Sequence, residues 1–152
     1  MSFRSGERAF LQFMRTKNLE QYLKERLRDA PISQFLGQRL VSCKVGRAAV
    51  RLPYRPEFQQ SYGVVHGGIV GTIADTCGFF AAASVSEQVV TTVEFKINLL
   101  SGAREENLLG IGKVVRNGKN LIVCEMTVYG SRRRKIALAT GTYARLEQKW
   151  DF

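Results

Sequence analysis

The chain has 152 residues, a formal net charge of +10 and 45% hydrophobic residues, an ordinary composition for one soluble globular domain with a substantial core. Its N-terminus carries no long apolar run, so neither a signal peptide nor a membrane span is expected. The odd number of widely spaced cysteines fits no metal site and indicates reduced core thiols in a cytoplasmic protein; they are Cys43, Cys77 and Cys124. We expect neither a metal nor a cofactor.

The positive charge is spread along the chain rather than held in one arm. The dense run from Arg132 to Lys135 follows Gly130 and precedes a strand pattern, which is typical of a solvated hairpin tip. No helix-turn-helix, zinc or RNA-recognition pattern accompanies it, so a nucleic-acid partner is not expected. A basic surface also suits the phosphates of coenzyme A.

The first part of the chain predicts helices. Residues 7–28 place apolar side chains at helical spacing between charged ones, which predicts an amphipathic helix. Asp29 before Pro31 resembles a helix N-cap, so a short second helix is expected to end at Gly37. We therefore predict an N-terminal helical extension over residues 1–29 and the main domain over 30–152.

The strands are predicted on both sides of a central helix. Two short strands at 40–45 and 48–52 make a hairpin, and Val93 to Leu99 alternate apolar and polar residues as a strand with one buried face does. Asn117-Gly118 joins the next two strands, 108–116 and 121–129, and a last strand covers 136–146. Short connections require a mostly antiparallel sheet, so the expected fold class is α+β, with a sheet wrapped around one apolar helix and exposed edges suited to a second subunit.

That central helix begins near Gly67 and Gly68 and has small or apolar residues on every side, which is typical of a helix buried all round. Glycine in a helix interior costs about 1 kcal/mol relative to alanine, so the bare backbone needs a reason. One reason is close packing on the sheet. The other is ligand contact with free N–H groups in the first helical turn, where a partial positive charge also lies.

Asp75 is the lone carboxylate of this helix. A buried ionised carboxylate is costly without partners. Two interpretations stay open: a structural one, in which Asp75 bonds neighbouring hydroxyls such as Thr72 or Thr76, and a catalytic one, in which it is a base or nucleophile with a tuned pKa. His66, the sole histidine, is expected to shape the turn before the helix rather than act as a base.

The sequence Val65-His66-Gly67-Gly68 followed by Asp75, together with this order of elements, resembles the hotdog-fold thioesterases, and among them the phenylacetate-pathway acyl-CoA thioesterases. The resemblance covers about residues 30–147. It implies that Asp75 is the catalytic carboxylate and that the backbone N–H of Gly67 polarises the thioester carbonyl.

The resemblance also implies a wider set of site residues. Gln60 stands where relatives carry an Asn or Gln near the thioester or the attacking water, and Thr92 or the adjacent Thr91 matches a Ser/Thr position on the strand after the helix. Where some relatives have a hydroxyl one turn after the acid, this chain has Phe79, so that variant of the site is absent. The substrate-binding residues expected from these positions are His66, Gly68, Phe58, Phe79 and Thr91.

Helix geometry adds a constraint. Gly67 and Asp75 are eight residues apart, which is about 12 Å along a helix. A catalytic group must approach within about 3 Å of the reacting atoms or act through one water, so one carbonyl cannot reach both residues of one helix. The two groups would come from different subunits, in agreement with the dimer-interface sites that the resemblance implies.

The leading hypothesis is an acyl-CoA thioesterase that acts as a homodimer or a dimer of dimers. The acyl group, aromatic, short or long, stays open, as does an acyl carrier protein in place of coenzyme A. The alternatives are a non-catalytic acyl-CoA sensor on the same fold, which the retention of Gln60 and Asp75 disfavours, and a hotdog hydratase, for which His66 lies in the wrong motif.

Overall fold

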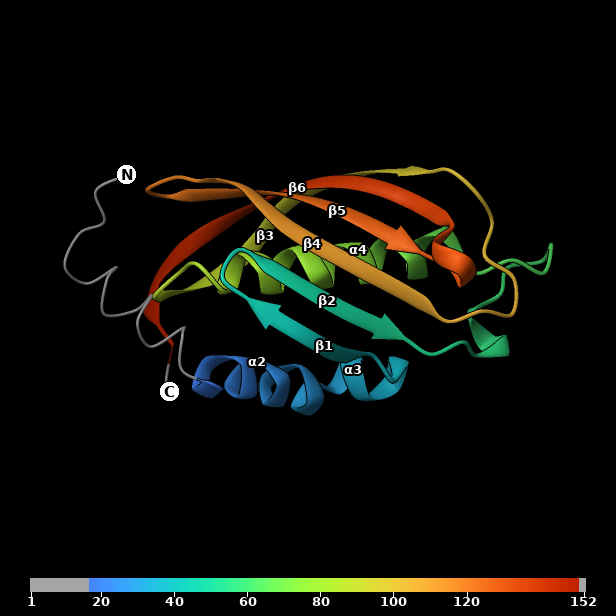
Figure 1. Cartoon of the computed structure of the whole chain (residues 1–152), viewed down its shortest axis with the longest axis horizontal. Coiled ribbons are helices and arrows are strands. Elements are labelled where there is room, and N and C mark those ends of the chain that lie inside the picture. Colours follow the sequence, from blue (N-terminus) through green and yellow to red (C-terminus); the bar gives the residue numbers. More distant parts are fainter. Residues whose placement is uncertain (1–16, 151–152) are drawn as a thin grey trace.

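The computed structural model describes residues 17–150 and is shown in Figure 1. The described helices are α2 (Lys17–Asp29), α3 (Pro31–Leu36) and α4 (Gly67–Ala83), with two 3₁₀ turns, η1 (Pro56–Phe58) and η2 (Ser131–Arg133). The described strands are β1 (Arg39–Lys44), β2 (Arg47–Leu52), β3 (Gln88–Leu99), β4 (Leu108–Asn117), β5 (Leu121–Tyr129) and β6 (Lys135–Lys149). This order of helices and strands confirms the predicted one.

The strands form one antiparallel sheet in the order β1-β2-β4-β5-β6-β3, which leaves β1 and β3 at its edges. The predicted Asn-Gly hairpin joins β4 to β5, where the Gly118 N–H donates to the Leu121 carbonyl at 2.9 Å. The sheet lies over α4, and α2 and α3 follow one another along the β1 side (Figure 1). The predicted α+β architecture is confirmed.

Close approach of α4 to the sheet explains some of the glycines. A Cβ at Gly112 of β4 would lie 2.2 Å from the backbone oxygen of Cys77, and a Cβ at Gly78 of α4 would lie 2.1 Å from the Tyr143 hydroxyl. Neither position has room for a methyl group. At Gly112 the strand therefore packs directly on the backbone of the helix, and at Gly78 the helix leaves room for the side chain of Tyr143.

Gly112→Ala is expected to lower the free energy of unfolding by about 3 kcal/mol, the upper range for overpacking a core, because the new methyl meets backbone rather than a movable side chain. Urea unfolding of the variant measures this loss. Gly71→Ala is the control, because a Cβ there would meet Phe95 at an ordinary 3.6 Å and the helix gains about 1 kcal/mol. Equal stability of the two variants would contradict the packing argument.

The N-terminal helices differ in detail from the predicted ones. The structure describes α2 from Lys17, so the predicted helical residues 7–16 lie outside the described part. The predicted N-cap Asp29 is wrong: Ala30 occupies that position without a side-chain bond, and Asp29 pairs with Arg28 at 2.7 Å. Because Pro31 at the first helical position has no N–H to satisfy, α3 depends less on a side-chain hydrogen bond from its N-cap residue. The end of α3 at Gly37, which has a φ of 74°, is confirmed.

The domain boundary at residues 29 and 30 stays a prediction. The apolar face of α2 is buried in the same core as the sheet, through Leu19, Leu23 and Leu27. The described part of the extension, α2, is therefore packed on the domain rather than separate from it.

Two predictions about burial are wrong for the single chain: that the strand from Val93 to Leu99 has one buried face, and that the central helix is buried on every side. Val93, Phe95 and Leu99 of β3 are 57%, 38% and 56% exposed, although Phe95 and Leu99 face α4. The helix also keeps one stripe partly exposed, at Gly68, Ile69, Thr72, Asp75, Thr76 and Phe79. The reason is the same for both: β3 is the last strand of the sheet, and no further strand within residues 17–150 covers its outer edge or the side of α4 next to it. None of the helices within residues 17–150 is both long and apolar enough to cross a bilayer.

Candidate active site

The start of α4 is held by its preceding loop. His66 is the N-cap of the helix, and its Nδ1 accepts a hydrogen bond from the Gly68 N–H at 2.9 Å. The loop itself is fixed because the His66 N–H donates to the Phe58 carbonyl at 2.7 Å and the Val65 N–H to the Ala103 carbonyl at 2.9 Å. This confirms that His66 shapes the turn.

The N–H of Gly67 is the free donor at this helix start. The Ile69 and Val70 N–H groups both donate to the His66 carbonyl, and the Gly68 N–H is taken by the His66 ring. Within residues 17–150, no acceptor bonds the Gly67 N–H. A preorganised backbone donor at a helix N-terminus is suited to an oxygen that gains negative charge.

Asp75 lies in the middle of α4, where it is the only charged side chain of the helix. Its Oδ1 accepts a hydrogen bond from Thr92 Oγ1 of β3 at 2.9 Å. The Tyr143 hydroxyl of β6 lies 3.3 Å from the Asp75 carbonyl and 3.4 Å from Oδ1. Neighbours from two strands thus hold one carboxylate oxygen, Oδ1, while Oδ2 has no protein donor among the described residues.

Burial raises the pKa of Asp75 above its ordinary value, because loss of water disfavours the charged form. The hydrogen bonds from Thr92 and Tyr143 act in the opposite direction, since they favour the carboxylate. A raised pKa makes the ionised carboxylate a stronger base. Burial also raises the pKa of the Tyr143 phenol, so this hydroxyl stays a proton donor at neutral pH.

The sequence argument missed Tyr143. It is fully buried on β6, and its position in an alternating apolar pattern is that of any core aromatic residue. Its hydroxyl reaches Asp75 only because Gly78, one turn later on α4, leaves the space free. No sequence signal could have linked these residues, which lie far apart in the chain.

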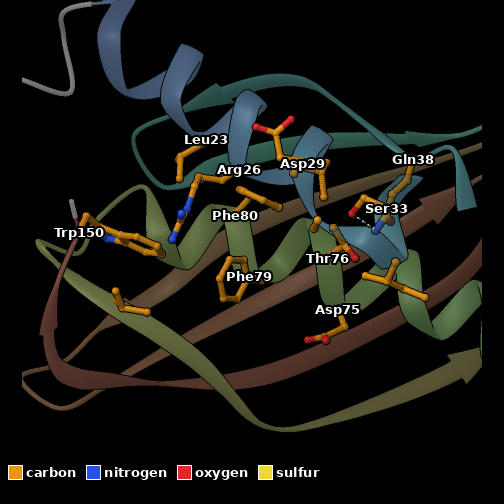
Figure 2. Close-up of a pocket in the computed structure, with 14 residues that line it drawn as sticks. Leu23, Arg26, Asp29, Ser33, Gln38, Asp75, Thr76, Phe79, Phe80 and Trp150 are labelled. Carbon is orange, nitrogen blue, oxygen red and sulfur yellow. Dashed lines mark hydrogen bonds between the residues drawn. The ribbon is translucent and has the colours of Figure 1, made fainter. Parts of the chain in front are cut away.

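A cavity of about 550 Å³ adjoins Asp75 between α4 and the N-terminal helices (Figure 2). Phe79 and Phe80 of α4 form part of its wall together with Leu23 and Leu27 of α2. Figure 2 shows Trp150 at one end of the cavity and Gln38 with Ser33 at the other. The volume lies within the range of small-molecule sites.

The structure divides the predicted site residues into two groups. The helix-start group consists of Gln60, His66, Gly67 and Gly68, with Phe58 buried beneath the loop. The carboxylate group consists of Asp75, Thr92 and Tyr143, beside the cavity that Phe79 lines. Gln60 accepts a hydrogen bond from the Tyr62 N–H at 2.5 Å, and within residues 17–150 it makes no bond to Asp75.

The remaining candidates are peripheral or structural. Thr91 is exposed on β3, and Thr92 rather than Thr91 donates the hydrogen bond to Asp75. The three thiols are buried and unpaired, and burial raises the pKa of Cys43 and of Cys124 to about 12. They therefore stay protonated and inert, as the sequence predicted.

The described residues contain no cluster of side chains suited to a metal ion.

Comparison with known proteins places this geometry in a family. The sequence profile of the thioesterase superfamily matches residues 62–137, which include the helix start, Asp75 and Thr92. The chain belongs to the thioesterase superfamily. The predicted enzyme class, a thioester hydrolase, is thereby confirmed.

Relatives of this thioesterase support the fold and the class. A Saccharolobus solfataricus protein named as an esterase is 34% identical over 78% of this chain and 85% of its own length. The Escherichia coli PaaI protein, from the phenylacetic acid degradation operon, superposes with a TM-score of 0.80 at 20% identity and covers 85% of this chain and 94% of its own. A Streptococcus mutans protein bound to acetyl-CoA superposes with a TM-score of 0.68 at 25% identity, over 73% of this chain and 90% of its own. The predicted hotdog fold is confirmed.

Proposed function

We propose that this thioesterase hydrolyses acyl-CoA and that each active site combines the helix-start group of one subunit with the carboxylate group of another. The observation that carries the proposal is the position of the two groups on one helix. Gly67 and Asp75 lie eight residues apart on α4, about 12 Å along its axis. One carbonyl carbon cannot be served by both groups of the same chain.

The open edge of the sheet supports the pairing of two chains. β3 is an edge strand with exposed apolar side chains, of which Phe95 and Leu99 face α4. Pairing of β3 with β3 of a second copy about a twofold axis continues the sheet, covers these apolar side chains and reverses the direction of the second α4. The start of one helix then approaches the middle of the other, which brings Gly67 toward Asp75 of the partner subunit.

The chemistry follows from the two groups. The Gly67 N–H donates to the thioester carbonyl oxygen, where negative charge develops as water attacks the carbonyl carbon. Asp75 of the partner subunit, with its raised pKa, takes the proton of that water as general base. The C–S bond then breaks, and the thiolate of coenzyme A leaves without a strong proton donor because it is a stable leaving group.

Coenzyme A is the favoured carrier for two reasons. A structural neighbour at 25% identity is bound to acetyl-CoA. The helix-start group also lies beside cations: Arg104 donates to the Tyr62 and Gly63 carbonyls at 3.3 Å, and the adjacent hairpin tip carries exposed Arg132 and Arg133. Positive charge at this end of the molecule suits the phosphates of coenzyme A.

The test is thiol release from a panel of acyl-CoAs of different size, with oligomeric state measured by light scattering on the same sample. Hydrolysis of at least one acyl-CoA by a dimer or larger assembly is the expected result. Tight binding of acyl-CoA without release of thiol would support the sensor instead, and a fully active monomer would contradict the shared site.

The pH dependence tests the hydrogen bond from Thr92. Because the base must be ionised, activity is lost as pH falls through the Asp75 pKa. Thr92→Val removes a bond that favours the carboxylate, so it raises the Asp75 pKa further and moves the acid limb of kcat/KM to higher pH. Thr140 is exposed on β6, so Thr140→Val is expected to leave the acid limb of kcat/KM at the wild-type pH. An unmoved limb in Thr92→Val, or a shift to lower pH, would contradict the role of Asp75 as base.

A further inference from the structure

The cavity beside Asp75 depends on elements at the two ends of the described chain. Leu23 and Leu27 of α2 form one wall, opposite Phe79 and Phe80 of α4. Trp150 closes one end, and its position is fixed because its Nε1 donates to the Ser86 carbonyl at 3.0 Å and its ring meets that of Tyr22 edge-on at 6.4 Å. Apart from the guanidinium of Arg26 beside Trp150 (Figure 2), the wall at this end is apolar and held in place, so it suits an apolar body.

The opposite end of the cavity is polar and contains a buried, unsatisfied acceptor. Gln38 is only 5% exposed, and its Nε2 donates to Ser33 Oγ at 3.0 Å. Among the described residues, its Oε1 has no hydrogen-bond partner. Both Gln38 and Ser33 line the cavity, as Figure 2 shows. A buried acceptor without a donor carries a desolvation cost that a ligand donor would remove.

The charged side chains of the cavity wall do not point to a charged ligand. Asp29 is exposed and paired with Arg28 at 2.7 Å, and the guanidinium of Arg26 lies 5.6 Å from the ring centroid of Tyr22. Arg26 keeps its positive charge, but it lies at the Trp150 end of the cavity rather than beside Gln38 (Figure 2), and Asp75 carries a negative charge that belongs to the reaction. A neutral donor, such as a hydroxyl or an amide N–H, therefore fits the free acceptor of Gln38 better than a second anion does.

We propose that this cavity takes acyl groups that have an apolar body and carry a neutral hydrogen-bond donor, and that Gln38 selects them through its free Oε1. The proposal rests on the acyl-CoA hydrolysis proposed above, because it places the acyl group beside Asp75. The cavity of about 550 Å³ has room for such a group together with part of the pantetheine arm.

The experiment compares matched substrates that differ only in a hydroxyl group. Hexanoyl-, octanoyl- and decanoyl-CoA are each measured against their ω-hydroxy derivatives, and phenylpropanoyl-CoA against its para-hydroxy derivative. Wild type is expected to prefer the hydroxylated member of at least one pair by about tenfold or more in kcat/KM, since a site built to bond a hydroxyl rejects the analogue that lacks it. Gln38→Met keeps the length of the side chain and removes the acceptor, so the preference is expected to disappear.

Two further variants separate selection from folding. Ser33→Ala removes the partner that orients the Gln38 amide and is expected to reduce the preference. Gln34→Met makes the same change as Gln38→Met at an exposed position of α3 and is expected to keep it. If wild type has the same kcat/KM for both members of every pair, or if Gln38→Met keeps the wild-type preference, the proposal is overturned whether or not the variants are stable.

Failure of the proposed function would be seen separately. If wild type hydrolyses none of these thioesters, thioether analogues of the same pairs are titrated by calorimetry. Tighter binding of a hydroxylated analogue that is lost in Gln38→Met would still support the cavity assignment. Equal binding, or no binding, would overturn it.

Discussion

Asp75→Asn is expected to lower kcat for thioester hydrolysis by at least about 100-fold, the scale of losing a main catalytic group. The amide of Asn keeps the shape of the side chain and an oxygen that accepts from Thr92, but it cannot take a proton from water. The measurement is steady-state thiol release by wild type and variant at one pH. KM is expected to change little, because the carboxylate acts on the water rather than on the bound thioester.

The same variant has a predictable effect on stability. The pKa of Asp75 is raised in the folded chain, so its contribution to stability is present below the ordinary pKa of about 3.9 and is lost as pH rises through the higher folded value. At pH 7, Asp75→Asn is therefore expected to unfold at a Tm equal to or above that of wild type, and the difference shrinks as the pH falls. Loss of activity with a raised Tm would show that the fold is intact.

Glu125→Gln is the matched control for Asp75→Asn. Glu125 is an exposed carboxylate on β5 that pairs with Lys113 at 3.5 Å, so its neutralisation is expected to leave kcat unchanged. Activity of Asp75→Asn within a few-fold of this control would contradict the catalytic interpretation and leave the structural one.

Gly67→Pro is expected to lower kcat by about 100-fold to 1,000-fold, the range measured when one oxyanion donor is removed. Proline lacks the N–H but suits the first position of a helix. The preceding residue is compatible too, because His66 has φ −58° and ψ 137°, within the extended region that a following proline requires. Steady-state kinetics on the acyl-CoA that wild type hydrolyses best, together with circular dichroism, measures the loss.

Gly67→Ala separates the missing N–H from the added bulk. Its Cβ would lie 2.8 Å from Leu99 Cδ1, which is the far end of a flexible side chain that can move. Alanine keeps the N–H, so Gly67→Ala is expected to retain most of the kcat that Gly67→Pro loses. Equal losses in the two variants would mean that space at the helix start matters rather than the donor.

The sequence predicts the fold well because its signals are local. The alternation of Val93 to Leu99, the Asn117-Gly118 turn and the Gly37 helix end each fix a strand, a hairpin or a cap from neighbouring residues. The lone carboxylate on an apolar helix and the glycine pair at its start predict the site for the same reason. These features need no knowledge of tertiary contacts.

The parts that were missed depend on contacts across the fold. Tyr143 reaches Asp75 only through the close packing of β6 on α4 at Gly78. Gln38, which follows α3, and Trp150, which follows β6, line the cavity because these two segments both lie against α4. The exposure of β3 depends on its place at the edge of the sheet, which the pattern of the strand alone does not state. Such features follow from topology rather than from local sequence.

The shared active site is tested most directly by mixing two inactive variants in one assembly. Asp75→Asn and Gly67→Pro chains carrying different tags are produced together, and the mixed dimers are purified through both tags. Each such dimer has one site with both changes and one site with neither, so we expect about half of the wild-type activity per dimer. Mixed dimers as inactive as either variant alone would contradict the account, because they would show that Gly67 and Asp75 do not act together across two subunits.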